Sequence, residues 1–140
     1  MENNWKFLHV GVITRDLDKT VDYFLSIGGH TTSDVINSEN EFRSLKIRMV
    51  DLGPITLEII QHVSGKCVQL DFLEKVGEGI NHFAYIVQDL NKEAEKMLAQ
   101  GATIINGRRD DEGYGFAYFA PNDAGANVIV ELIQRAEANS

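Results

Sequence analysis

Four side chains that could bind a metal ion occur in this chain as two equally spaced pairs. His9 and Glu58 form one pair and His82 and Glu131 the other, and in each pair the glutamate stands 49 positions after the histidine. Mixed imidazole and carboxylate donors suit zinc, nickel, cobalt, iron or manganese, whereas calcium and magnesium prefer oxygen ligands alone. Two neutral imidazoles and two carboxylates also balance the charge of a divalent cation, which offsets the cost of burying the carboxylates. We therefore predict that all four bind one divalent metal ion.

The equal spacing belongs to an internal repeat with a shift of 73 residues. The same shift superimposes Asp16 on Asp89, Gly28 on Gly101, and residues 57–61 on 130–134 without a gap. Such self-similarity indicates duplication of a supersecondary unit. A lone strand histidine or glutamate is more often structural than a ligand, but retention of four by the repeat favours metal binding. His30 and His62 have no histidine counterpart and are predicted to be structural or peripheral.

Each repeat has the hydrophobic pattern of a βαβββ unit. In the first repeat we predict a strand at 7–14, a helix that Asp16 caps and Gly28 ends, and strands at 31–37, 44–52 and 55–62. In the second we predict a strand at 80–87, a helix at 90–100, and strands near 102–106, 114–120 and 127–134. Gln61 and Gln134 also coincide in the repeat, but three residues from each glutamate they are expected on the opposite strand face.

The repeats predict a single α+β domain over residues 1–140. Its two repeats span about 5–62 and 79–135, and a connector at 63–78 joins them. A small sheet with one helix-covered face must bury its other face, so the two βαβββ units are expected to pair. They would form a curved mixed sheet around a metal-binding cavity.

Composition narrows the classes of partner. A formal net charge of -8 argues against nucleic acid, which normally requires a clustered basic face. Anionic small molecules stay possible, although clusters such as Arg108 and Arg109 are expected to be ordinary solvated charges. No stretch approaches the length of a membrane span, and the single cysteine, Cys67, favours a reducing compartment. We therefore expect a cytoplasmic protein that binds a small molecule.

The ligand spacing and one longer passage resemble a known family. A paired βαβββ chain with His9, Glu58, His82 and Glu131 at these places resembles the vicinal oxygen chelate superfamily, which includes glyoxalase I, methylmalonyl-CoA epimerase, extradiol dioxygenases and the fosfomycin and bleomycin resistance proteins. The passage FLEKVGEGINHFA at residues 72–84 is most similar to the methylmalonyl-CoA epimerase branch, as is the ending from Ala120 onward. The resemblance implies one bound divalent metal ion and a homodimer.

The resemblance also implies an activity. It implies a metal-dependent epimerase or isomerase that works through a metal-stabilised enolate, with an acyl-CoA or other thioester as substrate. An epimerase needs two bases on opposite faces of the planar intermediate. Glu131, as ligand and mobile base, and Glu41 are the candidates. This chain departs from the epimerases, which usually carry Gln-Gly ahead of the third strand and often Gln as the second ligand.

Two alternatives remain open. Glu58 is closer to the glyoxalase pattern, which favours a lyase similar to glyoxalase I, a lactoylglutathione lyase. Ring-cleaving iron dioxygenases use two histidines and one carboxylate, so the second carboxylate argues against them. The other alternative is a resistance protein that binds a small molecule without chemistry. Proteins of that kind commonly lack the ligand set.

Overall fold

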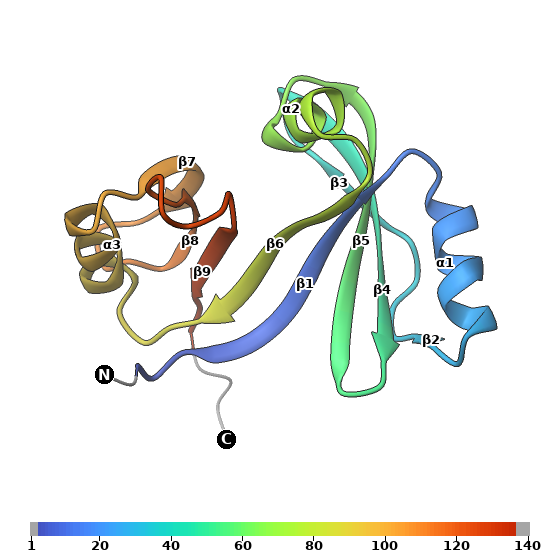
Figure 1. The fold of residues 1–140 in the computed structure, drawn as a ribbon, viewed down its shortest axis with the longest axis horizontal. Coiled ribbons are helices and arrows are strands. Elements are labelled where there is room, and N and C mark those ends of the chain that lie inside the picture. Colours follow the sequence, from blue (N-terminus) through green and yellow to red (C-terminus); the bar gives the residue numbers. More distant parts are fainter. Residues whose placement is uncertain (1–2, 137–140) are drawn as a thin grey trace. The chain divides into compact units, whose positions relative to one another are not determined.

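The computed structural model describes residues 3–136, and Figure 1 shows their secondary structure. By their internal contacts these residues form two compact units. The first unit is His9–Asn81, and the second combines the segment up to Leu8 with the chain from His82 onward. In chain order the elements are β1 (Lys6–Thr14), α1 (Leu17–Ser26), β2 (His30–Thr31), β3 (Ile36–Glu39), β4 (Arg43–Leu52), β5 (Ile55–Gly65), α2 (Val68–Lys75), β6 (Gly79–Ile86), α3 (Leu90–Ala99), β7 (Thr103–Arg109), β8 (Gly115–Ala120) and β9 (Ile129–Gln134).

The strands of the first unit pair in the order β2-β4-β5-β1, and β3 pairs with β4 beside β2. β1 and β5 are parallel, with Gly11 opposite Glu58 and Ile13 opposite Ile60. The β4/β5 hairpin is antiparallel, with Met49 opposite Glu58. The first strand of the unit therefore lies beside its last, which brings His9 to the strand that carries Glu58.

The second unit repeats this arrangement in the order β6-β9-β8-β7. β6 and β9 are parallel, with Ala84 opposite Glu131, while the β9/β8 and β8/β7 pairs are antiparallel. The residue pairs of the two parallel ladders correspond to one another at the shift of 73 residues. The α+β class, the mixed strand pairing and the repeated βαβββ order predicted from the sequence are confirmed.

One predicted strand is wrong. Residues 31–37 do not form a continuous strand but the two short strands β2 and β3, both paired with β4. Ser33 interrupts the ladder because its hydroxyl, in place of a backbone carbonyl, accepts a hydrogen bond from the Met49 amide at 3.0 Å. Its carbonyl accepts from Nε of Arg48. Serine commonly competes with backbone pairing in this way.

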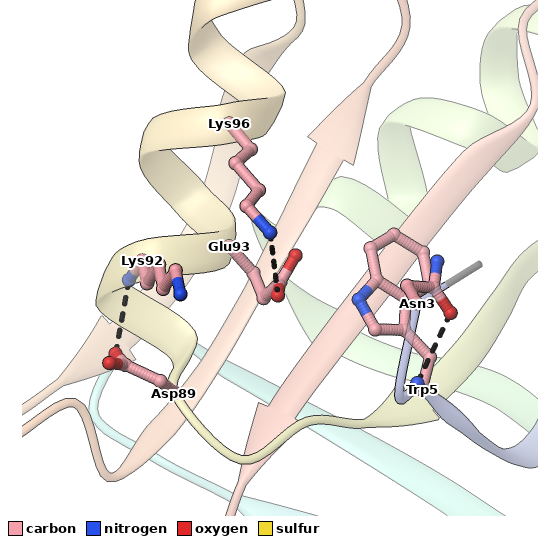
Figure 2. Close-up of polar contacts among 6 residues, drawn as sticks. All are labelled: Asn3, Trp5, Asp89, Lys92, Glu93 and Lys96. Carbon is pink, nitrogen blue, oxygen red and sulfur yellow. Dashed lines mark hydrogen bonds and ion pairs between the residues drawn. The ribbon is translucent and has the colours of Figure 1, made fainter. Parts of the chain in front are cut away.

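The helices that follow β1 and β6 begin in the same manner in both repeats. The carboxylates of Asp16 and Asp89 accept hydrogen bonds from the amides three residues later, both at 3.1 Å, and Figure 2 shows the Asp89 cap. The side-chain oxygens of Gln61 and Gln134 accept from the first helical amides, Leu17 and Leu90, both at 2.8 Å. The repeated glutamines therefore tie the last strand of each repeat to its helix.

An additional contact holds the segment before β6 in the first unit. The carboxylate of Glu78 accepts hydrogen bonds from the Arg15 amide at 2.8 Å and the Thr14 hydroxyl at 3.0 Å. The backbone hydrogen bond from Arg15, followed by the hydroxyl of Thr14, holds the pKa of Glu78 below its ordinary value of 4.5. The β1–α1 turn and the start of β6 are thus joined through one exposed carboxylate.

Helices pack against the strands of both units. In the first unit α1 contacts β4 and β5, while α2 supplies Phe72 and Leu73 to a cluster with the buried residues Ile13 and Ile60. In the second unit α3 packs on β8 and β9 around Leu132, Ala117 and Phe119. Because side chains alternate along a strand, Ile13 and Ile60 lie on the face that carries His9 and Glu58. The predicted connector is therefore also part of the wall beside the first His–Glu pair.

None of the helices among residues 3–136 is long and apolar enough to cross a membrane.

Candidate metal centre

The first histidine–glutamate pair is formed by the parallel ladder of β1 and β5. Nε2 of His9 lies 3.5 Å from Oε1 of Glu58, and His9 is 5% exposed. The residue directly opposite Glu58 is Gly11, two positions after His9 and on the same strand face. Because Gly11 has no side chain, it leaves room between the two strands for the side chains of His9 and Glu58 to come into contact.

The second pair repeats this geometry in β6 and β9. Nε2 of His82 lies 3.4 Å from Oε1 of Glu131; the histidine side chain is fully buried and the glutamate side chain is 8% exposed. Another small residue, Ala84, stands opposite Glu131 and two positions after His82. The ring of Tyr118 packs edge-on against His82, with centroids 5.0 Å apart, and fixes the plane of the imidazole. Each unit therefore offers one nitrogen and one oxygen donor in the same arrangement.

The donor separations fit a shared metal ion. Ligand atoms bound about 2.0–2.2 Å from one zinc-sized ion in tetrahedral geometry lie roughly 3.4 Å apart. The two measured separations, 3.5 and 3.4 Å, are close to this value. The second pair also places a carboxylate where water has little access, which is costly without a cation nearby: the Glu131 side chain is 8% exposed, whereas that of Glu58 is 19% exposed. Each pair thus has donors at a separation that both an ion pair and two ligands of one divalent metal ion would show.

Glu41 lies elsewhere in the first unit. It is exposed in the turn between β3 and β4. In this turn the side-chain oxygen of Asn40 accepts hydrogen bonds from the backbone amides of Phe42 and Arg43. Glu58 is paired with Met49, which is six residues further along β4 than Arg43. At about 3.3 Å per residue Glu41 is thus roughly 20 Å from the level of Glu58 along the strand. The register does not bring Glu41 to the His9–Glu58 pair.

The other histidines lie outside the pairs. His30 has a 70% exposed side chain and lies 3.8 Å from Asp51. His62 is within hydrogen-bonding distance, 2.7 Å, of the Gly65 carbonyl at the end of β5.

The surroundings of Glu131 were not predicted from the sequence. A pocket of about 660 Å³ in the second unit is lined by Glu131, aromatic side chains and three arginines, Arg108, Arg109 and Arg135. Tyr118 was missed as well; it stands opposite Glu131 in the β8/β9 ladder. Alternation along strands 114–120 and 127–134 could have placed Tyr118 and Phe116 on the face of Glu131, but the pairing register was not available from sequence.

Comparisons with known proteins agree with this architecture. A hypothetical protein from Bacillus halodurans is similar in structure, with a TM-score of 0.76, 20% identity and 99% of each chain covered. A methylmalonyl-CoA epimerase from Mycobacterium tuberculosis has a TM-score of 0.72 at 22% identity, over 98% of this chain and 94% of its own. At these identities the likeness concerns the fold.

A lactoylglutathione lyase from Arabidopsis thaliana is similar in sequence, with 25% identity over 134 residues. The match covers 96% of this chain but 46% of the lyase, so the chain spans about half the length of that relative. Residues 8–119 match the family described as the Glyoxalase/Bleomycin resistance protein/Dioxygenase superfamily. The matched range includes His9, Glu58 and His82 and ends before Glu131. The repeated βαβββ units, the two histidine–glutamate pairs and this match together place the chain in the Glyoxalase/Bleomycin resistance protein/Dioxygenase superfamily, also called the vicinal oxygen chelate superfamily.

Proposed function

We propose that His9, Glu58, His82 and Glu131 share one divalent metal ion and that the protein is a metal-dependent epimerase or isomerase. The observation that carries this proposal is the geometric equivalence of the two pairs, with nitrogen–oxygen separations of 3.5 and 3.4 Å on equivalent strands. A single domain in which the two units close around the ion is part of the proposal. When bound, a divalent ion of this kind polarises a substrate carbonyl and favours loss of a neighbouring proton.

The protein groups then have separate tasks. Glu131 is the proposed base, since its carboxylate is at once beside His82 and at the wall of the pocket in the second unit. It takes the proton from the carbon next to the carbonyl, which leaves a planar enolate. His82, held by Tyr118, keeps that carboxylate in place. Return of a proton from the opposite face inverts the centre, and this step requires a second acid.

Glu41 is the second candidate for proton transfer. Its position in the β3–β4 turn, distant along the strand from Glu58, supports the role less well than the position of Glu131 does. A thioester such as methylmalonyl-CoA is the proposed substrate, by similarity to the epimerase neighbour. A homodimer in the cytoplasm is the proposed state of the protein.

A second candidate function is that of a lyase resembling the lactoylglutathione lyase relative. Glu58 favours the lyase, because a glutamate at this position is closer to the glyoxalase pattern than to that of the epimerases. A reaction that returns the proton to a neighbouring carbon can also use a single base. The third candidate, a binding protein without chemistry, gives no reason for two carboxylates beside buried imidazoles.

The deciding experiment combines metal content with two assays on the full chain. After metal analysis of the purified protein, solvent deuterium uptake into methylmalonyl-CoA is followed by mass spectrometry, and hemithioacetal turnover is followed separately. Exchange in the thioester alone supports the epimerase, and product from hemithioacetal alone supports the lyase. Tight binding of a small molecule without either reaction would support the third candidate and contradict catalysis.

Variants assign the bases. We expect Glu131→Gln to abolish turnover in the active assay, while Glu39→Gln, an exposed acid at the end of β3, serves as the matched control and keeps the wild-type rate. Glu41→Gln tests the second candidate. An undiminished rate in that variant would remove Glu41 from the mechanism, and an undiminished rate in Glu131→Gln would remove the proposed base.

A further inference from the structure

The pocket beside Glu131 carries an unusual concentration of positive charge for so acidic a protein. The chain has six arginines and a formal net charge of -8, yet three of the six line this one pocket. No ion pair joins Arg108, Arg109 or Arg135 to an acidic group within residues 3–136. The nearby carboxylate of Asp110 accepts hydrogen bonds from the backbone amides of Glu112 and Tyr114. The guanidinium groups are therefore available to a ligand.

The strand register places Arg108 on the same sheet face as Glu131, and Arg135 follows the end of the strand that carries Glu131. In β9 the face alternates every second residue, so Glu131 and Ile133 share it. Arg135 is one residue beyond the end of β9 and lines the same pocket. The ladders place Phe116 opposite Ile133 and Arg108 opposite Phe116, and residues opposite one another in antiparallel strands share a face. Arg108 and Arg135 thus border an apolar patch on the face where Glu131 lies, and the opposite face is buried against α3.

The first unit differs in the residues at the equivalent place. Ile133 corresponds at the shift of 73 to Ile60, which in the first unit is buried against Phe72 and Leu73 of α2. By strand register Ile36 takes the place of Arg108, since Ile36 is opposite Ile47 and Ile47 is opposite Ile60. At the shift of 73, His62 takes the place of Arg135. The histidine–glutamate pairs are common to both repeats, whereas arginine at these two positions belongs to the second alone. An asymmetry of this kind is what a substrate with one charged end requires.

We propose that Arg108 and Arg135 bind an anionic group of the substrate, a carboxylate or a phosphate, while Glu131 acts on the carbon at the inner end of the same pocket. From the position of Glu131, the level of Arg108 is two residues and that of Arg135 four residues along the sheet. These steps amount to roughly 7 and 13 Å. The bound anionic group therefore lies close to the reacting carbon. This short distance fits an anionic group on the part of the substrate that reacts better than it fits the diphosphate at the far end of CoA. The placement of the reacting carbon rests on the proposed function; the anion site does not.

The test is an NMR titration of the full chain in EDTA, with inorganic phosphate and succinate as separate probes. We expect saturable shifts of the Gly115 and Phe116 amides that weaken as potassium chloride is raised. In the double variant Arg108→Gln/Arg135→Gln the affinity should fall at least about tenfold, because charge-assisted hydrogen bonds are lost. The control Arg15→Gln removes one arginine charge from the first unit and should bind as the wild type does.

The outcomes separate this inference from the proposed function. Preferential binding of succinate identifies a carboxylate as the substrate group, and preferential binding of phosphate identifies a phosphate. Absence of saturable shifts, or equal affinity in the double variant, overturns the anion site. Because the titration is performed without metal, saturable binding that the double variant weakens supports the site even if no metal-dependent reaction is found. Conversely, metal-dependent turnover without saturable binding of phosphate or succinate would support the proposed function and refute the anion site.

Discussion

The two buried residues of the second pair should make a large and specific contribution to stability. His82 has a fully buried side chain and contacts the nearly buried carboxylate of Glu131 at 3.4 Å. His82→Ala removes the imidazole and leaves that carboxylate in a dry site without it. Breaking a buried pair in this way costs about 3–5 kcal/mol. The entropy of unfolding, about 2.1 cal/mol/K per residue, gives roughly 0.3 kcal/mol/K for a chain of this length, so the melting temperature should fall by about 10–17 °C.

His30→Ala is the matched control for this prediction. It removes the same side chain from a contact with Asp51 at 3.8 Å, but there the histidine side chain is 70% exposed. Exposed pairs contribute about 0–1 kcal/mol, so the control should unfold almost as the wild type does.

Urea unfolding in EDTA, followed by far-UV circular dichroism, measures both variants. Adding Glu131→Gln to His82→Ala should recover on the order of 1–3 kcal/mol, because a neutral amide is cheaper to bury than a carboxylate. If His82→Ala costs no more than His30→Ala, or if the added Glu131→Gln brings further loss, burial does not dominate the energetics of this pair and the reasoning is wrong.

Three further predictions concern the metal, the segment before β6 and a helix terminus. Zinc at a hundredfold excess over its dissociation constant should stabilise the protein by about 2.7 kcal/mol at one ion per chain, and alanine at either paired histidine should abolish the whole effect; two independent ions per chain would contradict a shared site. Because the amide of Arg15 lowers the pKa of Glu78, the stabilisation by this carboxylate is full above pH 4.5 and lost as the pH falls through the lowered value. Glu78→Gln should therefore be less stable than the wild type at pH 7 and approach it in acid, and a difference independent of pH in urea unfolding would refute this. Gln134→Ala should cost about 1 kcal/mol in urea unfolding by freeing the Leu90 amide, whereas the exposed Gln88→Ala should cost nothing measurable.

Much of the candidate site could be predicted because duplication leaves a record in the chain. The shift of 73 residues identified His9, Glu58, His82 and Glu131 together, and their strand positions followed from local hydrophobic pattern. The helix starts at Asp16 and Asp89 were equally local, since a cap depends on a side chain and an amide three residues apart. These features depend either on interactions between residues close in sequence or on exact repetition, and both can be recognised in the sequence.

The repeat, the helix caps and the candidate ligands were thus determined by the sequence alone. Tertiary structure decided which strands are neighbours, and hence that Gly11 and Ala84 stand opposite the glutamates. It also decided that α2 packs on the strand face of the first unit that carries Ile13 and Ile60, and that Arg108 and Arg135 border a pocket beside Glu131. The split of 31–37 was decided in the same way, by a serine hydroxyl that meets the Met49 amide from another strand. The physical reason is that strand register is fixed by the packing of distant segments, and a shift of one residue would turn every side chain to the other face.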